Sequence, residues 1–194
     1  MLQNFAVFAL GIILLSSLIV VLLDNLNYRL IGLLLIYLAE SILIALVWPL
    51  GLASIKFVIG TICVIILFNS NISNVSTNDK KTNISYQMLK AVISILVWLL
   101  VFYFSSNLIQ VFPTNQYLIR GSFILIGLGI IQFGIVSDKI SVIIGLLMFF
   151  AGFEILYSTF ETSVLLAGLL AIVNLGVAFV GSYFLALGNT ELEN

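Results

Sequence analysis

Three ionisable residues lie within long apolar stretches of this 194-residue sequence: Glu40, Lys56 and Glu154. A charged side chain at the centre of a bilayer costs about 2.5–3.5 kcal/mol even on the mildest scales, and such residues usually pair with one another or line the path of an ion. A Glu carboxyl can exchange a proton or bind a cation, and a nearby Lys favours its ionised form. Proton or cation transfer is therefore the chemistry that these residue types could perform.

The composition indicates a membrane protein without a cofactor of its own. Hydrophobic residues make up 62% of the chain and charged residues only 8%, whereas soluble domains carry about 25% charged residues. The sequence has no His and a single Cys, Cys63, in an apolar stretch, which excludes haem ligation, most zinc sites and a disulfide framework. The net charge of −1 gives no indication of a nucleic-acid partner, and the lipid bilayer is the expected surrounding.

The lengths of the apolar stretches predict an all-α, polytopic protein with about seven transmembrane helices in one domain, residues 1–194. A helix needs about 20 apolar residues to cross a hydrocarbon core about 30 Å thick. The predicted spans are 5–23, 28–48, 50–68, 88–112, 117–136, 140–160 and 163–187. Pro49 divides one long stretch, and because Pro favours the first turn of a helix, we expect a tight hairpin there. Residues 69–87, rich in Asn, Ser and Thr, are predicted to form a polar loop on the inner side.

The distribution of basic residues predicts the orientation. In a seven-span arrangement, Arg120 falls near the side of the membrane on which the N-terminus lies, together with Glu161. Apart from Lys56, which lies within a span, the other basic residues fall on the opposite side: Arg29, Lys80, Lys81, Lys90 and Lys139. Because Lys and Arg accumulate on the cytoplasmic side, we expect a multi-pass protein of the cell (plasma) membrane with its N-terminus outside and its C-terminus cytoplasmic.

The charged residues are predicted to lie at similar depths. Glu40 is nine residues before Pro49 and Lys56 seven after it, which places both about 10–13 Å below the outer edge at 1.5 Å per residue. We therefore expect them to pair across the hairpin. Glu154 lies about 9 Å from the same edge, and Asn174 adds a neutral polar group on the last span. Two interpretations stay open: a buried pair that fixes helix packing, or part of an ion path.

Two segments of the chain resemble each other. Residues 31–40 and 144–154 both begin Ile-Gly-Leu-Leu, both end in Glu, and both precede a short break and another apolar helix. The two Glu residues are offset by one position. This similarity suggests a duplicated helical hairpin.

Four short motifs carry a resemblance to a known group of membrane proteins: Leu38–Ser41, Ser54–Lys56, Gly145–Leu147 and Val173–Leu175. The pattern resembles the small membrane subunits of complex I-like assemblies, among them the 4L-type subunit and the C-type subunit of cation/proton antiporters. In length and span count it looks most like the E component of group-4 membrane hydrogenases. Asn174 stands where that group has an acid, Glu154 lies one turn beyond the usual acidic position, and no Pro follows the Lys56 helix.

The resemblance implies a non-catalytic integral membrane subunit of a redox-driven ion-pumping complex, lining or scaffolding a proton or cation path beside other membrane subunits. In that group electrons travel through soluble partners, so the chain would belong to an oxidoreductase complex. Two alternatives stay open: a stand-alone small cation or solute transporter, and a membrane scaffold or assembly protein. The sequence has no Gly-rich phosphate loop and no nucleophile elbow, so we expect no catalysis by this chain alone.

Overall fold

The chain folds into apolar helices long enough to cross a membrane. The computed structural model describes residues 2–72, 84–111, 115–135 and 139–190, and these residues form seven helices and no strand. The helices are α1 (Leu2–Leu22), α2 (Leu26–Ile44), α3 (Leu50–Ile72), α4 (Ile84–Val111), α5 (Gln116–Ile135), α6 (Lys139–Ser158) and α7 (Val164–Thr190). Each contains an apolar stretch of 19 to 23 residues that could span a bilayer. The protein is thus an all-α, polytopic membrane protein, as the sequence predicts.

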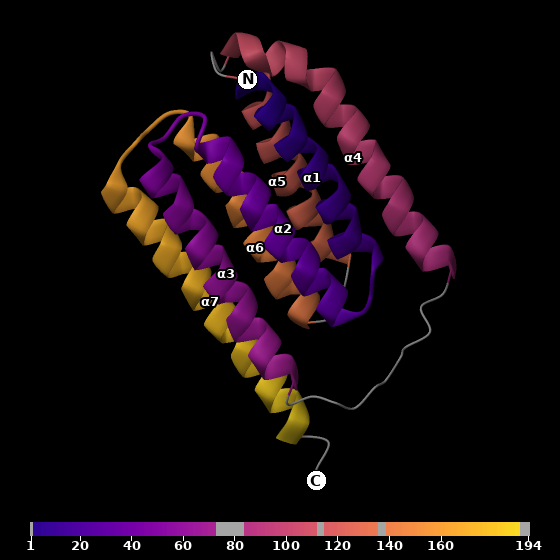
Figure 1. The fold of residues 1–194 in the computed structure, drawn as a ribbon. Helices are drawn as coiled ribbons and strands as arrows, with labels where there is room; N and C mark the ends of the chain where they lie inside the picture. The colour runs from indigo at the N-terminus through magenta and orange to yellow at the C-terminus, as the bar shows by residue number, and fades with distance from the viewer. Residues whose placement is uncertain (1, 73–83, 112–114, 136–138, 191–194) are drawn as a thin grey trace.

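Six of these helices form two layers of three. Helices α1, α2 and α3 make one layer, and α5, α6 and α7 make the other (Figure 1). Helix α1 packs against α5, α2 against α6, and α3 against α7, each pair running in the same direction, while α4 covers the edge formed by α1 and α5. The two segments that resemble each other in sequence, in α2 and α6, therefore occupy equivalent places in the two layers.

An N-cap asparagine and one proline set the starts of α2 and α3. The side chain of Asn25 accepts a hydrogen bond from the backbone N–H of Asn27 at 3.0 Å at the start of α2, the usual role of an N-cap Asn. Pro49 precedes α3, and its carbonyl accepts the N–H of Leu52 at 3.0 Å. The fixed φ of proline suits this first turn, so α2 and α3 form the expected hairpin.

Several helix ends differ from the predicted spans. Helix α2 ends at Ile44 rather than at residue 48, and α3 continues to Ile72 while α4 already begins at Ile84. The two ends of the predicted loop 69–87 are therefore helical, and its middle, 73–83, lies outside the described residues. Hydropathy reports only the part of a helix that lies in hydrocarbon, whereas a helix can continue through polar residues beyond it.

Glycines of α5 and α6 bring the backbones of these two helices close together. A Cβ atom added to Gly129 would lie 2.8 Å from the carbonyl oxygen of Gly145, and one added to Gly152 would lie 2.7 Å from that of Ser122. Small residues allow this approach between transmembrane helices. The close packing makes α5 and α6 a firm support for the charged side chain that α6 carries.

Candidate ion-binding site

A buried ion pair and two further hydrogen bonds join three helices. The ammonium of Lys56 on α3 lies 2.9 Å from Oε2 of Glu154 on α6, and the two side chains are only 5% and 2% exposed. The amide of Asn174 on α7 donates to Oε1 of the same carboxylate at 2.9 Å. Lys56 also donates to the backbone carbonyl of Ala167 at 3.3 Å. Both oxygens of Glu154 are thus engaged, which is the arrangement that a buried charge pair requires.

Glu40 on α2 adds a second carboxyl to this cluster. Its side chain is completely buried, and it lies close enough to Glu154 and Lys56 to interact electrostatically with both. Neither of its oxygens has a hydrogen-bond partner among the described residues. Helices α2, α3, α6 and α7 therefore all contribute to one polar cluster, consisting of Glu40, Lys56, Glu154 and Asn174.

The pairing within the cluster corrects the sequence prediction. Lys56 pairs with Glu154 in the opposite layer, and no ion pair joins it to Glu40 among the described residues. The reason is geometric. Helices α3 and α6 lie diagonally opposite each other in the two layers, and the long Lys56 side chain spans this diagonal. Its ammonium also contacts the backbone carbonyl of Ala167 on α7. Depth along the helices gave the level of each residue but not the direction in which its side chain points.

Tyr37 is a neighbour of the cluster that sequence reasoning missed. It lies one helical turn before Glu40 on the same face of α2, it is 1% exposed, and its ring packs against Gly60 of α3. Its hydroxyl is buried without a hydrogen-bond partner in the described part of the chain, as is Oδ1 of Asn174. The i, i+3 spacing from Glu40 is the sequence feature that could have identified Tyr37.

The cluster holds two carboxyls and one ammonium, and this imbalance determines its chemistry. The pair Lys56–Glu154 is neutral when both groups are ionised, which leaves the Glu40 carboxyl. A buried carboxylate without a partner is very costly, so this carboxyl needs a proton or a cation for charge balance. No group of three or more Cys, Asp and Glu residues is arranged as a metal site among the described residues. The cluster can therefore hold one additional positive charge.

Other buried polar groups lie outside the cluster. Arg29 at the start of α2 donates to Oγ of Ser141 on α6 at 2.9 Å, and Lys90 of α4 pairs with Asp24 at 3.1 Å. Gln132 of α5 is 2% exposed and makes no hydrogen bond with the cluster residues. These contacts join helices at the end of the bundle where α2 begins, away from the cluster.

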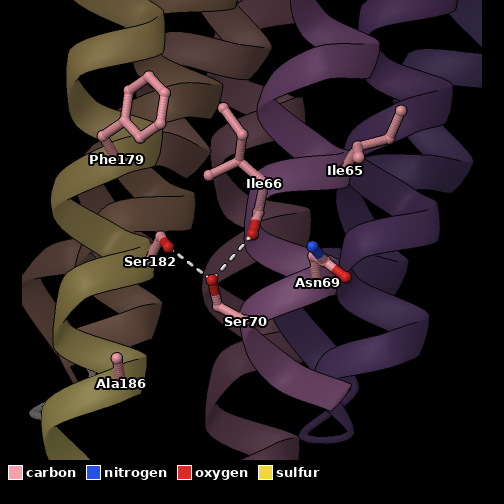
Figure 2. A pocket seen from close by; sticks show the side chains of 7 residues that line it. All are labelled: Ile65, Ile66, Asn69, Ser70, Phe179, Ser182 and Ala186. Carbon is pink, nitrogen blue, oxygen red and sulfur yellow. Dashed lines mark hydrogen bonds between the residues drawn. The ribbon is translucent and has the colours of Figure 1, made fainter. Parts of the chain in front are cut away.

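Two cavities lie along the contact between α3 and α7. The first, about 190 Å³, reaches Lys56 near the beginning of both helices. The second, about 420 Å³, lies near their ends, where Ser70 of α3 and Ser182 of α7 form a hydrogen bond (Figure 2). Asn69 and Phe179 also line this second cavity (Figure 2). Only the smaller cavity touches the charged cluster.

Comparisons with known proteins give no relatives: no protein-family model, no curated protein and no solved structure matches this chain.

Proposed function

We propose that this chain is an integral membrane subunit of a redox-driven ion-pumping complex, and that the cluster of Glu40, Lys56, Glu154 and Asn174 lies on its proton or cation path. The observation that carries the proposal is the convergence of Glu40 on the Lys56–Glu154 pair, with both Glu40 oxygens buried and without partners. The likeness of the motifs around Glu40 and Lys56 to subunits of complex I-like assemblies agrees with this function.

The cluster supplies the chemistry of a relay. With a proton or cation at Glu40, the Lys56 ammonium stays paired with Glu154, as in the structure. When the positive charge leaves, the ionised Glu40 carboxyl attracts the ammonium and competes with Glu154 for it. Opposite and like charges within a few ångström of each other change the charge state of a buried carboxyl strongly. Intramembrane ionisable residues commonly form proton relays of this kind.

The proposed orientation places the N-terminus outside and the C-terminus in the cytoplasm of a cell membrane. Arg29 and Lys90 both lie at the bundle end where α2 and α4 begin, and Lys139 begins α6 at the same end. Basic residues concentrate on the cytoplasmic side, which supports assigning that end to the cytoplasm.

Ion transport by the native assembly tests the proposal. Glu40→Gln keeps the size of the side chain and removes its exchangeable charge, and we expect it to lower ion transport at least about tenfold, a change of about 1.4 kcal/mol in barrier height. The matched control is Glu161→Gln, the same change at an exposed position between α6 and α7, which should leave transport unchanged. Normal transport by Glu40→Gln in a fully assembled complex would contradict the proposed path. Ion flux through the purified chain alone would instead identify a stand-alone transporter.

A further inference from the structure

Two carboxyls face each other within the buried cluster. Glu40 on α2 and Glu154 on α6 lie within hydrogen-bonding reach of each other, on helices that pack side by side, and the two residues are 0% and 3% exposed. An ionised carboxylate only accepts hydrogen bonds, so two ionised carboxylates in this position would repel each other. One proton between them turns this repulsion into a hydrogen bond, which is why carboxyls that share a site do not both ionise.

The surrounding donors determine which of the two carboxyls keeps its charge. Glu154 lies 2.9 Å from the Lys56 ammonium and accepts a hydrogen bond of 2.9 Å from the Asn174 amide. The oxygens of Glu40 receive no donor from the described residues. Because a nearby cation and hydrogen bonds favour the charged form of a carboxyl, Glu154 is the ionised member and Glu40 the protonated one.

We infer that Glu40 and Glu154 form a carboxyl–carboxylate pair that shares one proton, that the O–H of Glu40 donates to Glu154, and that the ion bound here is a proton rather than a metal cation. Uptake of the proton forms one O–H bond on Glu40 and breaks no bond in the chain. It leaves one carboxylate and one ammonium in the cluster, so the charges balance. The inference rests on the proposed function and deepens it, because it names the ion that the path carries.

The side chains of the cluster distinguish a proton from a metal cation. Hard divalent cations take about six to eight oxygen ligands, whereas no group of three or more Cys, Asp and Glu residues is arranged as a metal site in the described parts of the chain. A metal ion at Glu40 would also be repelled by the Lys56 ammonium, which interacts electrostatically with Glu40. A protonated carboxyl is neutral and meets no such repulsion.

The other titratable groups that face Glu40 add no charge to the site. Tyr37 on the same helix and Cys63 on α3 both interact electrostatically with Glu40, and both side chains are ordinarily neutral at neutral pH. Helix α1 carries no ionisable residue. The charged residue of α5, Arg120, donates to Oγ of Ser105 on α4 at 3.1 Å. The protonation of Glu40 is therefore governed by the carboxylate and the ammonium beside it.

Infrared difference spectroscopy of the purified native assembly tests the inference, because a protonated carboxyl has a C=O stretching band that a carboxylate lacks. We expect this band at neutral pH in the unchanged protein and in Glu40→Asp, and its loss in Glu40→Gln. Glu161→Gln, at an exposed position, is the matched control and should keep the band. A spectrum of the unchanged protein without the band, or a band that persists in Glu40→Gln, would overturn the inference.

Two further measurements test the sharing of the proton and the identity of the ion. In Glu154→Gln the Lys56 ammonium has Glu40 as its remaining carboxyl partner in the cluster, so Glu40 should ionise and the band should disappear; an unchanged band would contradict a shared proton. Replacing choline chloride by sodium chloride should leave the band of the unchanged protein as it is, whereas its removal by sodium would identify a metal cation. If the band behaves as expected but Glu40→Gln transports normally, the shared proton stands and the proposed path fails. If Glu40→Gln stops transport and sodium removes the band, the path stands and the assignment of a proton fails.

Discussion

The ammonium of Lys56 on α3 and the carboxylate of Glu154 on α6 lie 2.9 Å apart and join the two layers of the bundle across a diagonal. Both side chains are almost fully buried. The pair brings a residue from the first half of the sequence against one from the last third, so it links the layers directly rather than through the chain that runs from α3 by way of α4 to α5.

Removing one member of this pair should destabilise the protein more than removing both. Lys56→Met leaves the Glu154 carboxylate buried without its cation, and we expect a loss of about 3–5 kcal/mol. Lys56→Met combined with Glu154→Leu should recover most of that loss. Thermal unfolding in detergent, followed by Trp fluorescence, measures both variants. A double variant no more stable than Lys56→Met would contradict a structural ion pair.

The pair Asp24–Lys90 offers a comparison at the edge of the bundle. Its carboxylate side chain is 36% exposed, and partly exposed pairs contribute only about 0–1 kcal/mol. Asp24→Asn should therefore shift the unfolding transition little in the same assay. A loss as large as that of Lys56→Met would show that burial does not govern these pairs.

Asn174 should contribute to stability through one hydrogen bond. Asn174→Leu removes the donor to Oε1 of Glu154, and hydrogen bonds between transmembrane helices contribute about 0.6 kcal/mol on average and about 1.7 at most. We expect a loss in that range on unfolding in detergent. Asn69→Leu is the control, because Asn69 is exposed at the end of α3. Equal effects of the two substitutions would contradict a specific role for Asn174.

The contact between α5 and α6 should not accept a larger residue at Gly152. A Cβ there would lie 2.7 Å from the carbonyl oxygen of Ser122, so Gly152→Leu forces the helices apart, and overpacking typically costs about 1–3 kcal/mol or more. Gly134→Leu, at an open position on α5, should be well tolerated. The measurement is the yield and melting temperature of the purified variants. Equal behaviour would mean that the two helices can separate without cost.

The proposed orientation can be tested with single cysteines in a Cys63→Ala background. Thr162, between α6 and α7, and Asn27, at the start of α2, are both exposed at opposite ends of the bundle. Thr162→Cys should react with a membrane-impermeant maleimide in intact cells. Asn27→Cys should react only after permeabilisation. The reverse pattern would place the C-terminus outside.

The spans could be predicted from the sequence because bilayer thickness sets helix length. The hairpin at Pro49 followed in the same way from the preference of proline for a first turn. Their ends could not be predicted, because α3 continues through the polar residues Asn69 and Ser70, beyond the apolar run. Hydropathy gives no signal for such an extension.

The members of the cluster could be named from the sequence, but their contacts could not. Counting residues from Pro49 placed Glu40 and Lys56 at one depth, yet depth says nothing about which face of α3 turns toward α7. That face is set by packing between layers, and the layers bring together helices far apart in the sequence. The resemblance between 31–40 and 144–154 was the only sequence feature that linked α2 to α6, and it did not specify that they pack side by side.

The division of the cluster between two layers has a mechanical consequence. Glu40 and Lys56 belong to the layer of α1, α2 and α3, whereas Glu154 and Asn174 belong to the layer of α5, α6 and α7. Any sliding of one layer over the other must stretch the 2.9 Å contact between Lys56 and Glu154, and any change in the charge of the cluster must alter the force that holds the layers in register. The ion pair therefore resists sliding of one layer over the other. A change in the charge of the cluster would change this resistance, so the charge state and the relative position of the two layers are coupled.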